Sequence, residues 1–454
     1  MLNISAASLA AGGSAAPLAL GIPILVFVAA VVLFTLPTAS LPAIAFTVMV
    51  LVPDRLLFSS VLTLFPPEVL IMAMWSLRKV LELTRAPRGE TKPKGRGPLL
   101  AALAITVTWF VIVMLVHTPG RSTVWMVGLV ILVAIPTLFS DKGREAAALL
   151  KVWPWVGSAI ALYSCAQAIL QSNPLYDPLY RALGLPAIQH WSVFRADASL
   201  AHPLTAGMFF AMTLALCVGQ WINTSRRTFA VFALINGLGV ISTVSRGSYL
   251  AAGFGVAVVV VVALLAGKHF SRGRVVLIVA AFAAFAVFAL QSDSFVERSN
   301  STDGLGSASA RDDMWSITEA TASAYDWLGA GPGTAESASL PFNWKGLPIE
   351  NSYFQLLISV GIPGLLFFGL FILAALRIGL RERNLAALGA VGALLVAIGG
   401  YAAIDGPRTA LGLLAFALIL VTENSNHADE SADAETSEHD VTQRPRGTHR
   451  HRTL

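Results

Sequence analysis

A few arginines stand in the short polar stretches between long apolar runs. Arg246 lies in TVSRGSYL, and similar stretches hold Arg195 (FRADASLAHPLTAG), Arg298 (FVERSN), Arg311 (ASARDDMW) and Arg408 (DGPRTA). A guanidinium group is a planar fork of donors that matches phosphate oxygens in bidentate geometry. Together these residues predict a polyanionic ligand, for which a diphosphate is the natural candidate. Snorkelling, or pairing with lipid phosphates, is the alternative for each of them.

Three other polar residues stand where apolar runs begin. Glu350 and Asn351 precede SYFQLLISVGIPG, and His202 precedes PLTAGMFF. Glu350 has three open interpretations: a general base, a salt-bridge partner for an arginine, or a carboxylate stabilised near a helix N-terminus. Asn351 suits the cap of its helix. A lone histidine at such a position is more often structural than catalytic, so catalysis by His202 is the minority interpretation.

A glycine run precedes this region. The stretch WLGAGPGTAES contains Gly329, Gly331 and Gly333, which would let backbone N–H groups approach a ligand. A flexible turn is the alternative interpretation, and the more frequent one for such a run.

Several common chemistries lack their motifs. The sequence has no D-x-D or H-E-x-x-H pattern and no Cys/His cluster with ligand spacing, so no metal and no cofactor is predicted. It also lacks a P-loop and a G-x-S-x-G motif, which argues against an ATP-driven pump or a serine hydrolase. Nothing in it indicates nucleic acid as a partner.

The elements that must position these residues are membrane helices. Of the 454 residues 56% are hydrophobic and 13% are charged, and the mean hydropathy is +0.70. A soluble domain would carry about a quarter charged residues. We therefore predict an all-α, polytopic helical membrane protein with about 12 (11–13) transmembrane helices. The candidate spans are 19–37, 39–52, 56–77, 98–117, 122–139, 147–171, 203–221, 228–243, 248–266, 275–291, 351–376, 385–402 and 408–422.

The basic residues alternate between the loops. The 78–97 stretch is strongly basic, and every second loop after it carries two or three Lys or Arg residues. Because positive loops stay in the cytoplasm, Arg246 and the long 292–350 loop are predicted on the extracytoplasmic face of a bacterial cell membrane. We expect short helices in that loop, a single transmembrane domain over 1–422 whose site is formed by loops 172–202 and 292–350, and a disordered cytoplasmic tail over 423–454.

The order of these motifs resembles the O-antigen ligase and polymerase superfamily, which comprises bacterial membrane glycosyltransferases. The resemblance covers roughly residues 190–380. It rests on FRADASLAHPLTAGMFFAMTLAL, STVSRGSYLAAGFG, ERS…SARDDMW…YDWLGAGPGTAE and IENSYFQLLISVGIPGLLFFGLF. Such enzymes act outside the cytoplasm on polyprenyl-diphosphate-linked glycans. The resemblance therefore implies a lipid-linked donor, a glycan or lipid acceptor, surrounding membrane lipids, and a flippase and a chain-length regulator as partners.

The resemblance also implies roles for matching positions. Arg246 and Arg311, with Arg195, would hold the diphosphate, and the residue before Asn351 would stand at the reaction centre. That residue is commonly a histidine in ligases and is Glu350 here, which favours a polymerase. The predicted catalytic residues are therefore Glu350, Arg246 and Arg311. The predicted substrate-binding residues are Arg195, His202, Arg298, Asn351, Tyr353 and Gly331.

Three functions remain open: a polysaccharide polymerase, a ligase that transfers a finished glycan to a lipid or other acceptor, and a glycan or lipid transporter without catalysis. A transporter would be expected to carry ionisable groups within its spans on both sides. The unusual charges of this chain gather on one predicted face, which favours an enzyme.

Overall fold

The computed structural model describes the backbone of residues 34–57, 65–85, 96–117, 119–140, 143–185, 193–266, 272–291, 297, 302–405 and 408–422. Every regular element within these ranges is a helix, as predicted. The helices are α2 (Leu41–Leu51), α4 (Pro67–Arg85), α5 (Gly97–His117), α6 (Pro119–Leu129), α7 (Ile135–Phe139), α8 (Arg144–Leu170), α9 (Tyr176–Ala182), α10 (Pro203–Thr224), α11 (Arg227–Ser242), α12 (Arg246–Leu265), α13 (Arg272–Gln291), α15 (Thr302–Ala324), α16 (Ala335–Ser339), α17 (Ser352–Arg381), α18 (Leu385–Ala397) and α19 (Arg408–Val421).

Six of the described helices are long and apolar enough to cross a membrane, which makes this a multi-pass membrane protein. They are α5, Ser122–Phe139 (α6 to α7), α8, α10, α12 and α17. Four shorter apolar helices add to them: Thr38–Leu51, Arg227–Ser242, Leu385–Gly400 and Thr409–Val421. The predicted count of about 12 spans is therefore not confirmed. The expected span 19–37 lies almost wholly outside the described residues, and the tail 423–454 lies wholly outside them.

The span expected over 56–77 lies partly outside the described residues, because 58–64 are not among them. Helix α4 begins at Pro67, where a fixed φ suits a first helical position, and it continues to Arg85. Lys79 therefore stands in a helix and not in the predicted basic loop. Its ammonium group lies 2.8 Å from a carboxylate oxygen of the fully buried Glu145 in α8. This pairing compensates both charges and lets the polar part of α4 pack on the bundle.

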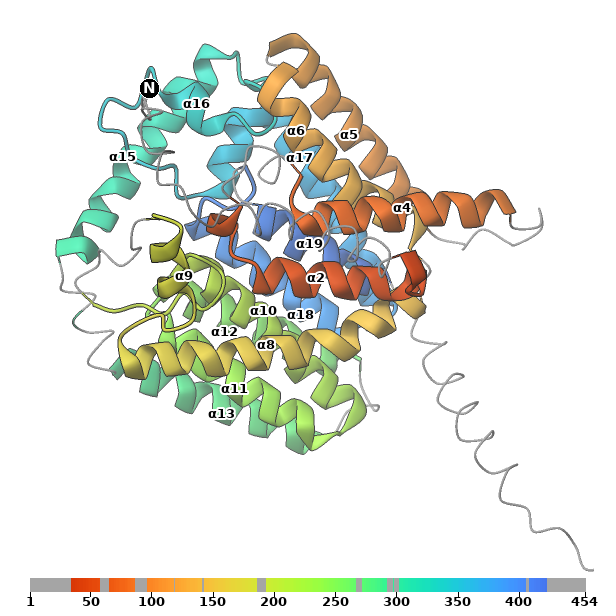
Figure 1. The fold of residues 1–454 in the computed structure, drawn as a ribbon, viewed down its shortest axis with the longest axis vertical. Helices are drawn as coiled ribbons and strands as arrows, with labels where there is room; N and C mark the ends of the chain where they lie inside the picture. Colours follow the sequence, from red (N-terminus) through yellow and green to blue (C-terminus); the bar gives the residue numbers. More distant parts are fainter. Residues whose placement is uncertain are drawn as a thin grey trace, which may run out of the picture.

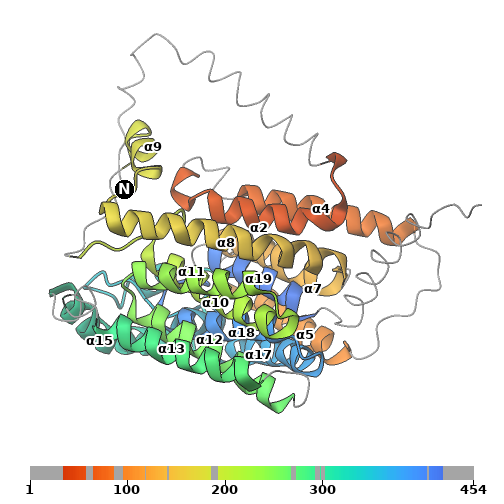
Figure 2. The ribbon, with the colours of Figure 1, turned by 90° about the horizontal axis from the view of Figure 1, so that it is seen from below.

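The long outer segment also differs from its prediction. Short helices were expected over 292–350, but α15 alone has 23 residues. Two views place α15 and α9 at the same end of the bundle, opposite the C-terminal end of α4 (Figures 1 and 2). The two predicted outer loops, 172–202 and 292–350, thus contribute helices to one end of the molecule.

Helix α10 lies at the centre of the bundle, and 89% of its most apolar 18-residue stretch is buried. Figure 2 shows it between the α2 and α4 side and the side formed by α12, α13 and α17. Small residues allow its close neighbours to approach: Gly219 packs on the backbone of Ala386 in α18, and Gly255 of α12 packs on Ala215. Such contacts are typical of membrane bundles, where packing replaces the hydrophobic effect between helices.

We expect Gly219→Ala to destabilise the protein. A Cβ at this position would lie 2.5 Å from the backbone nitrogen of Ala386, which cannot rotate away. Overpacking of this kind costs about 1–3 kcal/mol, more than the roughly 1 kcal/mol that alanine gains over glycine in a helix. Thermal unfolding in detergent measures the effect. Gly369→Ala in α17 is the control, because nothing lies within 4 Å of its Cβ position, and equal melting of the two variants would contradict the packing argument.

Candidate active site

Four segments converge at the end of the bundle that carries α9 and α15. They are the stretch before α10, the turn between α11 and α12, the start of α17 and the connection between α18 and α19. Three hydrogen bonds join them: Ala196 N to Ser242 O at 3.1 Å, Thr205 Oγ1 to Tyr401 Oη at 2.8 Å, and Ser352 Oγ to Tyr401 O at 2.8 Å. The folded chain thus brings together residues that are up to two hundred positions apart.

Arg195 is buried against the turn that holds Arg246. Only 5% of Arg195 is exposed, and its Nε donates to the carbonyl of Thr243 at 3.1 Å. That turn is tight, because Val244 adopts a positive φ of 46° and the Ser245 hydroxyl caps α12 by accepting from Ser248 N. Arg246 is the first residue of α12 and is exposed. One fixed and one accessible guanidinium group therefore flank the same turn.

His202 caps the N-terminus of α10. Its Nδ1 accepts a hydrogen bond from Leu204 N at 3.2 Å, and its ring stacks on that of Tyr401, with 5.2 Å between the centroids. Burial, followed by the positive charge of Arg195, lowers the pKa of His202 to about 4. At neutral pH the imidazole is therefore uncharged. Since Nδ1 accepts, the ring proton resides on Nε2, and His202 is suited to donate a hydrogen bond rather than to carry charge.

The charges of two carboxylates act on Tyr401. Burial raises the pKa of the Tyr401 hydroxyl to about 12 despite its hydrogen bond with Thr205, and the charges of Asp54 and Glu350 add to the rise. Both acids must therefore lie near this phenol. Glu350 is half-buried directly before α17. Asp54 and Tyr401 were not among the site residues predicted from the sequence, where each is only a polar residue near the end of an apolar run.

A polar network holds the stretch before α10 in place. The side-chain amide of Gln167 accepts from Ala198 N at 2.8 Å and donates to Ala198 O at 3.1 Å, which stabilises a positive φ of 53° there. Asn173 donates to Asp197 at 3.0 Å. Burial raises the pKa of Asp197 to about 6. Gln167 and Asn173 thus fix the backbone that carries Arg195 and His202.

The glycine run docks on a break in α17. At Gly361 the helix adopts φ 70°, and a Cβ there would lie 2.3 Å from the Trp327 carbonyl oxygen. The backbone groups freed by this break pair with the loop: Ala330 N donates to Ile358 O, Gly331 N to Ser359 O, and Ile362 N to Trp327 O, at 2.8–2.9 Å. Non-helical backbone inside a membrane protein needs such partners.

Asp405 secures the same loop from the α18–α19 connection. Its buried carboxylate accepts from Gly333 N at 2.9 Å, from Ala335 N at 2.7 Å and from the Ser359 hydroxyl at 2.7 Å. The amides of the glycine run are therefore directed at protein acceptors, as expected for a structural turn. Binding of substrate by Gly331 stays a prediction without a contact to support it.

Of the remaining predicted residues, Asn351 and Tyr353 have described side chains, and those of Arg298 and Arg311 are not described. Asn351 caps α17, since its Oδ1 accepts from Tyr353 N at 2.9 Å and from Phe354 N at 3.3 Å, and the Tyr353 hydroxyl donates to Leu395 O at 2.6 Å. Capping by Asn351 is thus confirmed. Arg311 lies in α15 with its side chain outside the described part, and Arg298 lies outside the described residues. Across the described residues no group of three or more His, Cys, Asp or Glu is placed to hold a metal.

Residues 229–369, from α11 to α17, match the model of the O-antigen ligase family. The predicted relationship to the O-antigen ligase and polymerase superfamily is confirmed. The matched stretch includes the Arg246 turn, the glycine run and Glu350, whereas Arg195, His202 and Tyr401 lie outside it and join it only in the fold. No curated protein matches the chain.

We expect Asp405→Asn to loosen the loop over 325–350. An amide has one acceptor oxygen, so at least one of the three donors now bound by the carboxylate loses its partner. A hydrogen bond to a charged group contributes about 1.5–3 kcal/mol. Limited proteolysis should cut this loop faster in the variant. Asp326→Asn, at an exposed position in the same loop, should leave the cleavage rate unchanged; protection of the Asp405 variant equal to wild type would refute the role.

Asp197→Asn should change how stability depends on pH. The folded pKa of about 6 lies above the ordinary value of 3.8, so Asp197 stabilises the fold below that lower value. This contribution is lost as the pH rises through 6. Wild type should therefore lose thermal stability relative to Asp197→Asn between these two pH values. A constant difference in melting temperature over that interval would contradict the assignment.

Proposed function

We propose that this protein transfers a glycan from a polyprenyl diphosphate to an acceptor hydroxyl at the end of the bundle where Arg195, His202, Tyr401 and Glu350 meet. The observation that carries the proposal is the match to the O-antigen ligase family over residues 229–369, together with the hydrogen bond by which Arg195 joins that matched region at Thr243. An O-antigen ligase or polymerase type of membrane enzyme is thereby supported. The substrates and the residue roles are our proposal.

The leaving group explains the arginines. No sugar nucleotide is supplied outside the cytoplasm, so the donor must carry its own activation, and a diphosphate on C1 does so. Negative charge grows on the phosphate oxygen as the bond to the sugar breaks, and fixed positive groups lower the energy of that state. We assign this task to the exposed guanidinium of Arg246 and the buried charge of Arg195, with the Nε2–H of His202 as a neutral donor.

Glu350 is the proposed general base. The acceptor oxygen attacks the anomeric carbon, the bond from that carbon to the diphosphate oxygen breaks with its electron pair leaving on the phosphate, and the hydroxyl proton passes to Glu350. Tyr401 stays protonated because the pKa of its hydroxyl is raised to about 12, and it does not compete for this proton at neutral pH. A single displacement of this kind inverts the anomeric configuration.

The site is proposed to face the extracytoplasmic side of the bacterial inner membrane. Loops at the opposite end of the bundle carry basic residues, among them Arg226, Arg227, Arg272 and Arg381. Positive loops are retained in the cytoplasm. The active end would then meet lipid-linked glycans after they have crossed the membrane.

A transfer assay tests the activity. Purified protein is incubated with a polyprenyl-diphosphate-linked oligosaccharide, and the products are separated by size. A ladder of products is expected from a polymerase, the function that Glu350 in place of a histidine favours. One discrete transfer product, formed only with a second acceptor, would instead assign a ligase. Failure to form any glycosidic product while the lipid-linked glycan crosses the membrane of a proteoliposome would replace both with a transporter.

Two variants test the residue roles in that assay. Glu350→Gln should lower kcat by about 10²–10⁴-fold, the usual contribution of a general base. Arg246→Lys keeps the charge but loses the bidentate fork, and turnover should fall by about 10²-fold. Glu382→Gln and Arg381→Lys, both at the opposite end of α17, are the matched controls. Turnover by Glu350→Gln equal to its control would remove Glu350 from the chemistry.

A further inference from the structure

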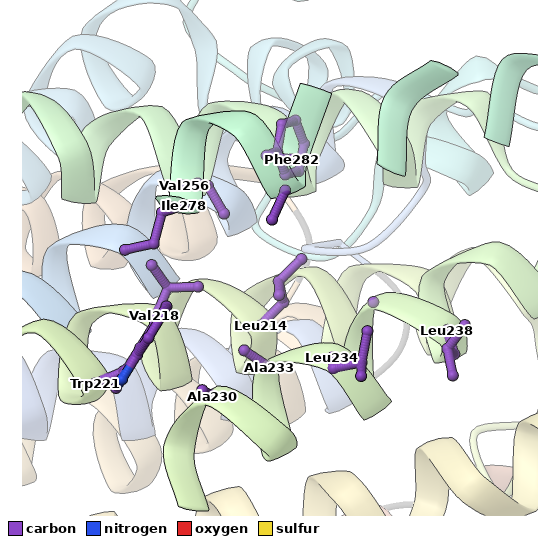
Figure 3. Close-up of a pocket in the computed structure, with 12 residues that line it drawn as sticks. Leu214, Val218, Trp221, Ala230, Ala233, Leu234, Leu238, Val256, Ile278 and Phe282 are labelled. Atoms are coloured by element: carbon purple, nitrogen blue, oxygen red, sulfur yellow. The ribbon is translucent and has the colours of Figure 1, made fainter. Parts of the chain in front are cut away.

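An apolar groove lies between helices α10, α11, α12 and α13, far from the candidate active site. Its cavity has a volume of about 160 Å³ and is lined by Leu214, Val218 and Trp221 of α10, Leu234 of α11, Val256 of α12 and Phe282 of α13, among others. Figure 3 shows these side chains around a common space, with only the indole nitrogen of Trp221 as a polar atom among the labelled side chains. Leu234 is 66% exposed, so the groove opens to the surface that faces lipid.

One end of this groove is strongly basic. Arg226 and Arg227 stand at the start of α11, about one helical turn from the groove residue Ala230. Arg272 and Arg274 stand in the first turn of α13, within about two helical turns of the groove residue Ile278. Arg274 donates to the carbonyl of Ile222, at the end of α10, at 3.3 Å. Arg226, Arg227 and Arg272 are exposed and form no ion pair with the described part of the chain. The sequence contains no Asp or Glu from 198 to 292, so this charge is not balanced locally.

We infer that this groove binds the acyl chain of an anionic phospholipid, whose headgroup phosphate is held by Arg226, Arg227 and Arg272. A basic cluster between membrane helices attracts anionic headgroups, and guanidinium forks match a phosphate. A half-buried tryptophan between the groove and the arginines stands where aromatic residues favour the membrane interface. The lipid thus belongs to the leaflet opposite the candidate active site.

Other lipids fit this geometry less well. A zwitterionic headgroup brings its own cation next to the arginines, and the repulsion of that cation offsets the attraction of its phosphate. The polyprenyl diphosphate of the proposed donor must place its phosphates near His202, at the other end of α10. That helix has 22 residues, which corresponds to about 33 Å. One lipid cannot place its phosphates at both ends, so the groove is a separate site and does not rest on the proposed activity.

Native mass spectrometry of the full chain in detergent tests this inference. The protein is titrated with phosphatidylglycerol or phosphatidylcholine that carry identical acyl chains. Wild type should retain one phosphatidylglycerol at least tenfold more tightly than phosphatidylcholine, and this lipid should raise its melting temperature more. Equal affinity for the two lipids would overturn the inference, as would displacement of phosphatidylglycerol by equimolar undecaprenyl phosphate.

Paired variants separate this site from general lipid contact. Arg226→Gln with Arg227→Gln, and independently Leu234→Trp, which fills the groove, should each weaken binding of phosphatidylglycerol about tenfold. Arg377→Gln with Arg381→Gln, near the C-terminus of α17, is the control for charge. Val261→Trp, at a 52% exposed position of α12 outside the groove, is the control for bulk. Binding that the controls reduce as much as the groove variants do would contradict the assignment.

Discussion

The candidate active site depends on the hydrogen bonds that the buried carboxylate of Asp405 accepts. It accepts two backbone amides from the glycine run and its neighbour and one hydroxyl from α17. These bonds tie together the loop after α15, the broken helix α17 and the connection that carries Tyr401. A buried anion is costly unless its hydrogen bonds are satisfied. Here the same hydrogen bonds stabilise the Asp405 anion and give the loop amides their acceptors.

The break in α17 provides the backbone groups that bind the loop over 327–334. A continuous helix would leave no free backbone groups near Gly361, and the loop over 327–334 would have nothing to pair with. The positive φ at Gly361 exposes these groups where the loop passes. The start of α17, and with it Glu350, is consequently held in two ways. The loop binds to the break in α17, and the Ser352 hydroxyl bonds to Tyr401 O and Ala403 N in the connection between α18 and α19.

The charges of the site follow from its burial. The Arg195 guanidinium donates to the carbonyl of Thr243. Burial, followed by the positive charge of Arg195, lowers the pKa of His202 and keeps its imidazole neutral. The charges of Asp54 and Glu350 act on Tyr401 and add to the rise in the pKa of its hydroxyl.

Part of this site was predictable from the sequence, and part was not. The Arg246 turn, Glu350 and His202 were selected because polar residues at the ends of apolar runs are rare and local. Tyr401, Asp54 and Asp405 have ordinary sequence surroundings, and only their contacts reveal them. Lys79 was expected in a loop and stands in α4, because hydropathy alone does not register a buried partner: Glu145 neutralises Lys79 from a distant helix. The predicted polyanion site is reduced to Arg195 and Arg246 among the arginines whose side chains are described.

The sequence by itself determined that this is an all-helical membrane protein and predicted its similarity to the O-antigen ligase and polymerase superfamily, which the family match over residues 229–369 supports. Hydropathy, charge alternation and short motifs are local properties of the chain. The sequence also determined the cap at Asn351, which needs only the neighbouring amides. Tertiary structure alone decided which polar groups meet. The pairing of Arg195 with Thr243, the stacking of His202 on Tyr401 and the docking of the glycine run on Asp405 join residues from distant segments. Their energies come from burial and hydrogen-bond geometry, which exist only once the helices have packed.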